Sequence, residues 1–283
     1  MSHAPKEITI ETPRGQIGGL VWGEGVPFLG LHGWLDNANT FATLAPKFKN
    51  IQLIAVDLPG HGKSYKKPWG ASYFFIDHVT EVLDIAKALN LNRFGIIGHS
   101  MGAGIASLLA GALGDSITHT ILLEGIGPLT REGSGTTKAY ADAYRLDRAL
   151  QPEDKIFPNW NALVETRKRL GGLLKSSASL LMERGTEKLE GGRYRLLRDV
   201  RLTTPSLLRM TEAQVQDFLQ SITSPTLLLE AEQGTLSHFP VGERIKSVKT
   251  LRFEKCPGRH HFHLDNPDEV FIRIEKFFAE FPL

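Results

Sequence analysis

The sequence predicts an α/β fold in which helices cover both faces of a mostly parallel sheet. Short apolar runs alternate with segments of helical apolar spacing before residue 127 and after residue 223. This alternation is typical of consecutive β–α units, which bring parallel strands side by side. Helical, charge-rich segments interrupt it between residues 128 and 222. We therefore expect a core made of residues 1–127 and 223–283, with a helical cap inserted at 128–222.

The composition is that of an ordinary globular chain. Its 283 residues are 41% hydrophobic and 23% charged, with a formal net charge of +2. No basic tract indicates nucleic-acid binding, and no apolar stretch is long enough to span a bilayer. The single cysteine, Cys256, excludes an internal disulfide, and residues 1–15 contain no apolar signal core. We expect a cytoplasmic protein with no stable membrane association.

Each strand is predicted from an apolar run or from apolar–polar alternation that ends at a turn. The first two runs flank a Thr-Pro-Arg-Gly turn and predict a hairpin, whereas the later runs are continuously apolar, as in buried parallel strands. The strand preceding Gly98 begins near Arg93. The other predicted strands are Glu7–Glu11, Gln16–Trp22, Pro27–Leu31, Ile51–Val56, Thr118–Leu123, Pro225–Glu230 and Lys249–Glu254.

Helices are predicted where apolar residues recur at three- and four-residue intervals. In the core these are Thr40–Phe48, Phe75–Leu89, a helix of small residues after Gly102, and Pro267–Phe278. In the insertion they are Thr137–Leu150, Asn161–Leu174 and Met210–Leu219, with no convincing strand.

The pattern with the most chemical content is Gly98-His99-Ser100-Met101-Gly102. An apolar strand enters this Gly-x-Ser-x-Gly turn and a helix leaves it, which is the setting of a nucleophile elbow. An ordinary strand-to-helix turn with a capping serine is the alternative. The setting favours Ser100 as a nucleophile whose hydroxyl is exposed at the carboxyl end of a strand.

A serine nucleophile requires a base and donors for the oxyanion. The N–H of Met101, at the start of a helix, and that of Trp34, after the strand and the His32-Gly33 turn, are the candidate donors. His260, His261 and His263 follow the last predicted strand, and we favour His260 as the base because it follows a Pro-Gly-x turn. No cysteine or carboxylate pattern completes a zinc site around these histidines, so no metal is expected.

The acid that would orient the base has three candidates. Glu124 ends a strand within the apolar sequence Leu122-Leu123-Glu124-Gly125-Ile126, where a carboxylate calls for a partner. Glu230 and Glu232 follow the strand that begins at Pro225. A solvated loop carboxylate is the plain alternative for each of the three.

Together these motifs resemble the α/β-hydrolase superfamily over almost the whole chain. The resemblance rests on His32-Gly33-Trp34, Asp57-Leu58-Pro59-Gly60-His61-Gly62, the Ser100 pentapeptide and Gly258–Pro267. Within the superfamily the chain is most similar to the serine hydrolase-like proteins, through residues 32–38 and Arg184-Gly185-Thr186. The resemblance implies a cofactor-free hydrolase with a cap between the sixth and seventh strands.

The resemblance also bears on the triad. In such hydrolases the histidine lies seven residues before a proline like Pro267, with a further histidine three residues after it, which implies His260. The acid usually lies nine residues beyond a proline like Pro225, but Gly234 occupies that position here. Some relatives place the acid after the sixth strand instead, which implies Glu124 and leaves Glu232 in reserve.

The expected function is hydrolysis of small or medium carboxylic esters through Ser100, His260, Glu124 and an acyl-enzyme. Thioester, lactone or carbon–carbon hydrolysis and acyl transfer use similar triads, and a catalytically quiet ligand-binding protein is the non-enzymatic alternative. The sequence does not name the substrate, its acyl length or the oligomeric state.

Overall fold

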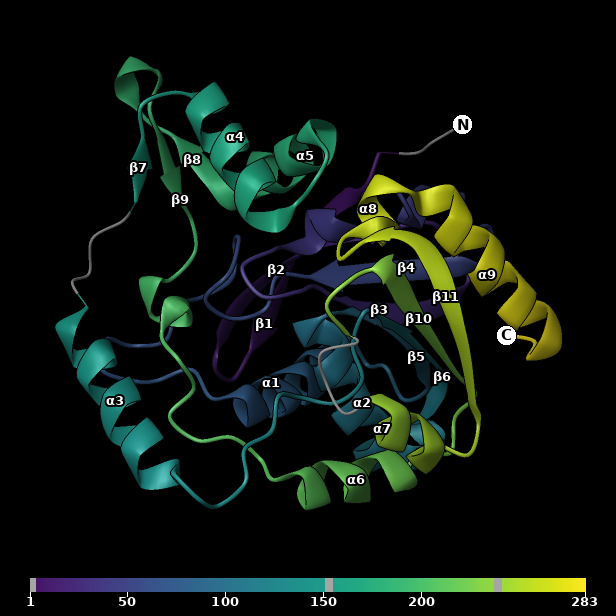
Figure 1. Ribbon diagram of the computed structural model, residues 1–283. Helices are drawn as coiled ribbons and strands as arrows, with labels where there is room; N and C mark the ends of the chain where they lie inside the picture. The colour runs from purple at the N-terminus through teal and green to yellow at the C-terminus, as the bar shows by residue number, and fades with distance from the viewer. Residues whose placement is uncertain (1–3, 151–154, 237–240) are drawn as a thin grey trace.

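An eight-stranded sheet organises the molecule (Figure 1), for which the computed structural model describes residues 4–150, 155–236 and 241–283. The strand order is β1-β2-β4-β3-β5-β6-β10-β11. β1 and β2 form an antiparallel hairpin at one edge, and β2 is antiparallel to β4, whereas every later pairing is parallel. The bounds are Lys6–Thr12, Gly15–Trp22, Val26–Leu31 (β3), Ile51–Val56 (β4), Phe94–His99 (β5), Ile117–Leu123 (β6), Thr226–Gln233 (β10) and Leu251–Arg259 (β11). The predicted mostly parallel sheet is confirmed.

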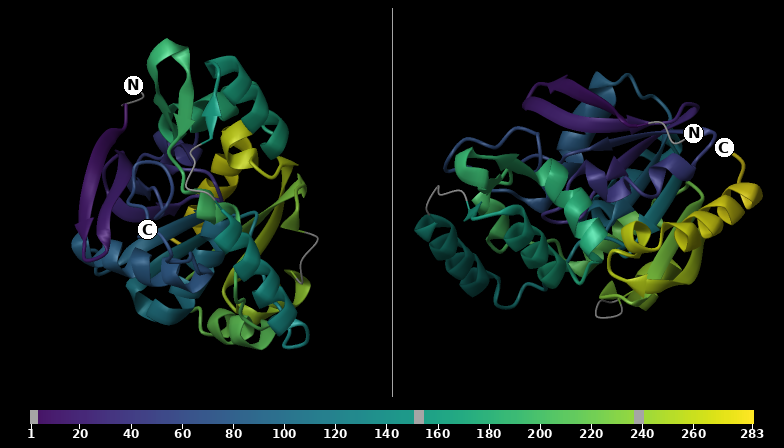
Figure 2. Two further views of the ribbon diagram at one scale, coloured as in Figure 1. Left: turned by 90° about the vertical axis from the view of Figure 1, so that its left-hand side faces the viewer. Right: turned by 90° about the horizontal axis from the view of Figure 1, so that it is seen from above.

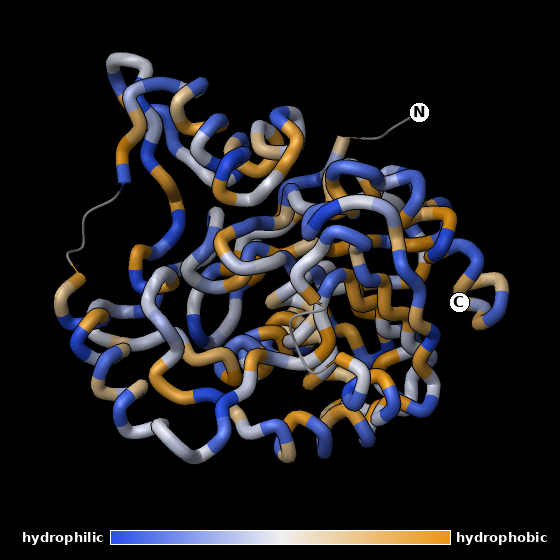
Figure 3. Tube along the Cα trace, in the orientation of Figure 1, coloured by the Kyte–Doolittle hydropathy of each residue, from blue (hydrophilic) through white to orange (hydrophobic). Residues whose placement is uncertain are grey.

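Helices cover both faces of this sheet, as predicted (Figure 2). Apolar residues of α1 (Phe75–Ala88), α2 (Met101–Leu113), α6 (Glu212–Gln220) and α7 (Val241–Ser247) share one buried cluster with the strands. Residues of α9 (Pro267–Glu280) and of two short turns near Phe41 and Ala45 form the cluster on the other face. The hydropathy colouring shows apolar residues concentrated along the strands between these layers (Figure 3).

The segment between β6 and β10 carries α3 (Thr136–Ala149), α4 (Trp160–Gly171) and α5 (Lys175–Gly185), followed by α6. It also contains a three-stranded antiparallel sheet of β7 (Ile156–Phe157), β9 (Tyr194–Leu196) and β8 (Thr186–Lys188). The prediction that this segment lacks strands is therefore wrong, because strands of only two or three residues are too short to show apolar periodicity. α6 lies within the predicted cap range but packs against α2 of the core.

Two predicted elements differ in detail from the structure. Thr40–Phe48 forms two 3-10 turns, Ala38–Phe41 and Ala45–Lys47, in place of one helix, and Pro46 lies within the second. β11 continues to Arg259, so the Pro257-Gly258 pair lies inside a strand and not in a turn. His260 thus follows the strand directly. No helix among the described residues is long and apolar enough to cross a membrane.

Candidate active site

Ser100 stands at the sharp junction between β5 and α2. Its backbone has φ 52° and ψ −112°, a region that non-glycine residues rarely occupy, and its N–H donates to the carbonyl of Leu123 at 2.9 Å. A Cβ at Gly102 would overlap the carbonyl of Leu31, so glycine allows α2 to approach β3 this closely. Within the described part of the chain, Ser100 Oγ has no hydrogen-bond partner. The hydroxyl is therefore partly exposed and uncommitted at the carboxyl edge of the sheet.

Two backbone N–H groups lie at the same edge. Met101 is the first residue of α2, so its N–H has no acceptor within the helix. Trp34 follows β3, which neighbours β5, and its N–H has no partner among residues 4–150, 155–236 and 241–283. The indole Nε1 of Trp34 donates to the carbonyl of Leu202 at 2.7 Å. This contact ties the Trp34 loop to the inserted segment.

The three C-terminal histidines have different surroundings. His260 is the most exposed, with 26% of its side chain accessible, and its carbonyl accepts from His99 Nε2 at 2.9 Å. His261 Nε2 lies 3.1 Å from Asp36 Oδ2, and His263 Nε2 lies 2.8 Å from Thr40 Oγ1. Both of these rings are engaged in buried contacts. His260 is thus the histidine of the three that remains accessible.

Glu124 places a buried carboxylate beside His260. The residue follows β6 with φ 54° and is 3% exposed. Its oxygens accept from the backbone N–H groups of Ala231 at 2.6 Å, Thr235 at 2.6 Å and Leu236 at 2.9 Å. Its Oε1 lies 3.8 Å from His260 Nδ1, while Thr235 Oγ1 lies 3.2 Å from the same nitrogen.

The ionisation of Glu124 reflects these contacts. Burial alone would raise the pKa of the Glu124 carboxyl, but the His260 ring and the backbone N–H groups outweigh burial and hold the pKa below its ordinary value. The side chain is therefore a carboxylate at neutral pH. It can accept from the His260 Nδ1–H and stabilise the imidazolium after a small closing movement.

Gly234 occupies the position where the family usually has its acid, and the structure gives a physical reason for the glycine. A Cβ at position 234 would lie within 2.6 Å of all three atoms of the Glu124 carboxylate. The carboxylate from β6 therefore fills the space that a side chain at 234 would need. Glu232 is exposed and Glu230 is buried, and neither makes a hydrogen bond or ion pair with His260 among the described residues.

Two other histidines of the sequence motifs accept hydrogen bonds from backbone N–H groups. His32 Nε2 accepts from the Leu58 N–H at 2.9 Å, and His61 Nε2 accepts from the Leu35 N–H at 3.2 Å. Burial lowers the pKa of both rings, so they are neutral acceptors. They shape the loops after β3 and β4, as the resemblance implied for the loop that contains His61.

Sequence reasoning missed the ion pairs that dock the inserted segment on these loops. Arg184 of α5 contacts both oxygens of Asp57 at 2.9 Å and also pairs with Glu7, and Asp57 is fully buried. Arg167 of α4 pairs with Asp36. Asp57 and Arg184 both lie in motifs that carry the family resemblance, but nothing in the sequence indicated that the two side chains contact one another.

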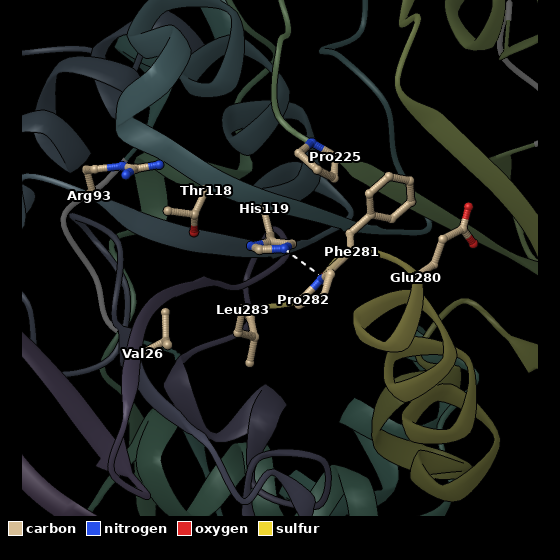
Figure 4. A pocket seen from close by; sticks show the side chains of 9 residues that line it. All are labelled: Val26, Arg93, Thr118, His119, Pro225, Glu280, Phe281, Pro282 and Leu283. Atoms are coloured by element: carbon tan, nitrogen blue, oxygen red, sulfur yellow. Dashed lines mark hydrogen bonds between the residues drawn. The ribbon is translucent and has the colours of Figure 1, made fainter.

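A hollow at the other end of the sheet is remote from this chemistry (Figure 4). It is lined by residues at the amino ends of strands, including Val26, Arg93 and Thr118, and by the C-terminal segment. His119 Nε2 donates to the carbonyl of Phe281 there, at 3.0 Å. In parallel α/β sheets, ligands bind at the carboxyl ends of the strands, where Ser100 lies. The edge of the sheet that carries Ser100 is therefore the candidate functional site.

Comparison with known proteins agrees with this architecture. The profile of the alpha/beta hydrolase fold family matches residues 26–267. The chain belongs to the α/β-hydrolase family. A serine hydrolase-like protein of Dictyostelium discoideum is 34% identical over 97% of this chain and 82% of its own length. A serine hydrolase-like protein of Danio rerio is 31% identical over 98% of this chain and 89% of its own.

Solved structures show the same fold. A hypothetical protein of Pseudomonas aeruginosa superposes with a TM-score of 0.90 at 36% identity, covering 96% of this chain and 99% of that one. A thioesterase domain from the curacin biosynthetic pathway superposes with a TM-score of 0.85 at 24% identity, covering 96% and 100%. The resemblance to serine hydrolase-like α/β-hydrolases is therefore confirmed.

Proposed function

We propose that the protein is a serine hydrolase that cleaves carboxylic esters through Ser100, His260 and Glu124. The observation that carries this proposal is the buried Glu124 carboxylate, held by three backbone N–H groups at 3.8 Å from His260 Nδ1. A carboxylate fixed in this way against an accessible histidine has the arrangement that a general base requires.

In the proposed reaction, Ser100 Oγ attacks the ester carbonyl carbon while His260 Nε2 takes the hydroxyl proton. The N–H groups of Met101 and Trp34 donate to the oxyanion, and Glu124 stabilises the imidazolium through Nδ1–H. His260 then protonates the leaving alkoxide, and the C–O bond breaks to leave an acyl-Ser100 ester. Water, deprotonated by His260, attacks this ester and releases the acid and the free serine.

The position of the inserted segment supports a covered site and a small or medium substrate. Asp36 follows β3, in the loop that contains Trp34, and pairs with an arginine of α4. Asp57 follows β4, in the loop that contains His61, and pairs with an arginine of α5. We propose that residues 128–222 act as a cap bounded near 127 and 222; this range includes residues 151–154, which lie outside the described residues.

Labelling with a fluorophosphonate tests the proposal directly. The wild-type chain is expected to gain one adduct by intact mass and to hydrolyse short p-nitrophenyl esters. Ser100→Ala should lose both properties, with turnover falling by several orders of magnitude. Ser176→Ala, at an exposed serine of α5, is the matched control and should react like the wild type.

Two results would contradict the assignment. Unchanged labelling of a folded Ser100→Ala protein would exclude Ser100 as the nucleophile. A folded wild-type protein that neither labels nor turns over esters and thioesters would favour a catalytically quiet member of the family.

A further inference from the structure

A cluster of three buried side chains lies beside the proposed triad but takes no part in it. Asp36, His99 and His261 come from the loop after β3, the end of β5 and the segment after β11. Asp36 Oδ2 lies 3.1 Å from His261 Nε2 and 3.7 Å from His99 Nδ1. The three ligand atoms all lie within 4.8 Å of one another. Two imidazoles and a carboxylate thus converge on one point.

One ring nitrogen of His99, Nδ1, has no hydrogen-bond partner in this cluster. His99 Nε2 must carry a proton, because it donates to the carbonyl of His260 at 2.9 Å. In the neutral ring Nδ1 then presents a lone pair, and this fully buried atom has no hydrogen-bond partner among the described residues. A lone pair and the Asp36 carboxylate therefore face each other at 3.7 Å, an arrangement that a cation between them would stabilise.

Glycine at position 33 leaves room between these two atoms. A Cβ there would lie 2.8 Å from His99 Nδ1 and 3.1 Å from Asp36 Oδ2. A tetrahedral zinc ion with bonds of about 2.0–2.1 Å holds its ligand atoms about 3.3 Å apart. The two distances to Asp36 Oδ2 lie on either side of this value, and the three ligand atoms lie within 4.8 Å of one another, so coordination requires the two rings to rotate toward a common point.

We propose that Asp36 Oδ2, His99 Nδ1 and His261 Nε2 form a binding site for a divalent transition-metal ion such as Zn²⁺. Two neutral imidazoles and one carboxylate are a ligand set that suits Zn²⁺, with a fourth position left for water. Coordination through His261 Nε2 would place the ring proton on Nδ1, a buried atom that has no hydrogen-bond partner among the described residues. The site does not depend on the proposed hydrolysis.

No sequence pattern indicated this site. Around His260, His261 and His263 the sequence offered no cysteine or carboxylate pattern, because Asp36 lies 225 residues before His261. Only the convergence of the three strand ends brings the carboxylate to the imidazole.

Arg167 sets the strength of the site. Its Nη2 pairs with Asp36 Oδ1 and lies 3.4 Å from His261 Nε2. The guanidinium therefore competes with a metal ion for the carboxylate charge. Its side chain is 15% exposed, against 1% for Asp36 and 7% for His261, so it is the outermost member of the group. Replacing it with an apolar side chain should open the site and tighten metal binding.

Metal titration tests the proposal without reference to activity. The probes are Co²⁺, followed by its visible absorption, and Zn²⁺, followed by competition with a chromophoric chelator. The wild type is expected to bind one ion with absorption typical of tetrahedral coordination. Asp36→Asn and His261→Gln should each weaken binding about tenfold or more, and Arg167→Met should strengthen it by a similar factor.

His119→Gln is the matched control, since it removes a histidine in the hollow at the other end of the sheet. Its affinity should equal that of the wild type. No bound ion in the wild type and in Arg167→Met, or equal affinity in wild type and His261→Gln, would overturn the proposal. If Asp36→Asn does not fold, the His261→Gln and Arg167→Met comparisons decide the matter.

Discussion

Gly234→Ala probes the geometry of the candidate acid with a single methyl group. The new Cβ would lie 2.0 Å from Glu124 Oε1, whereas ordinary contact begins at 3.4 Å. The carboxylate would therefore have to retreat by about 1.4 Å. Hydrogen bonds of 2.6 Å from the N–H groups of Ala231 and Thr235 would stretch to about 4.0 Å, at which they are lost.

The expected magnitude follows from these lost contacts. A hydrogen bond to a charged group contributes about 1.5–3 kcal/mol, so loss of one or two should lower the free energy of unfolding by about 1.5–6 kcal/mol. Displaced Glu124 would also fail to orient His260. Misorientation of the base in a serine triad lowers turnover by about 10⁴-fold at most. Ester turnover should thus fall about 10²–10⁴-fold even in folded protein.

Thermal unfolding and ester turnover measure the two effects separately. Gly242→Ala is the matched control, because a Cβ there meets no atom of the described residues within 4 Å and the residue lies on α7. It should keep wild-type turnover and stability. Equal turnover and equal stability of Gly234→Ala and Gly242→Ala would refute this placement of Glu124, since the carboxylate could not then occupy the space beside residue 234.

Three further outcomes are expected. Glu124→Gln keeps the shape of the side chain but removes its charge, so ester turnover should fall while circular dichroism stays native; normal turnover in this variant together with a loss in Glu232→Gln would reassign the acid. Arg184→Met leaves the buried Asp57 carboxylate uncompensated, and denaturant titration should show a loss of about 3–5 kcal/mol; a loss below about 1 kcal/mol, as for exposed ion pairs, would contradict this. Burial alone would raise the pKa of Asp199, but Arg201 outweighs burial and holds the pKa below its ordinary value. The pair therefore stabilises the fold above about pH 4 and is lost as pH falls through the lowered pKa, so the stability difference between wild type and Asp199→Asn should shrink below pH 4; a difference independent of pH would contradict it.

Local patterns predicted most of the core. The apolar runs gave β4 its bounds and the other core strands bounds within a few residues, because buried parallel strands require continuous apolar residues. β11 was longer than predicted, since its pairing with β10 continues past Glu254 through a change of register. The strands of the insertion were missed because they are too short to show periodicity.

The candidate site also contains residues that local sequence predicted and one, the acid, that it did not. Ser100 and Trp34 were predicted from turns that the chain makes locally. His260 was favoured because it follows a Pro-Gly-x turn, but this turn is wrong, since Pro257 and Gly258 belong to β11. The choice between Glu124 and Glu232 could not be made locally, because it depends on which carboxylate reaches His260 from another strand. In the structure Glu124 is the carboxylate beside His260.

The sequence by itself determined the order of the core strands, the strained turn at Ser100 and the family to which the chain belongs. These features follow from short-range steric and apolar patterns that a few neighbouring residues carry. Only the tertiary structure decided that the Glu124 carboxylate fills the space beside Gly234, that Arg184 meets Asp57, and that Asp36 joins His99 and His261. Each of these contacts joins residues from separate strands or from the insertion. Their energy depends on burial and distance, which exist only once the sheet has brought the strand ends together.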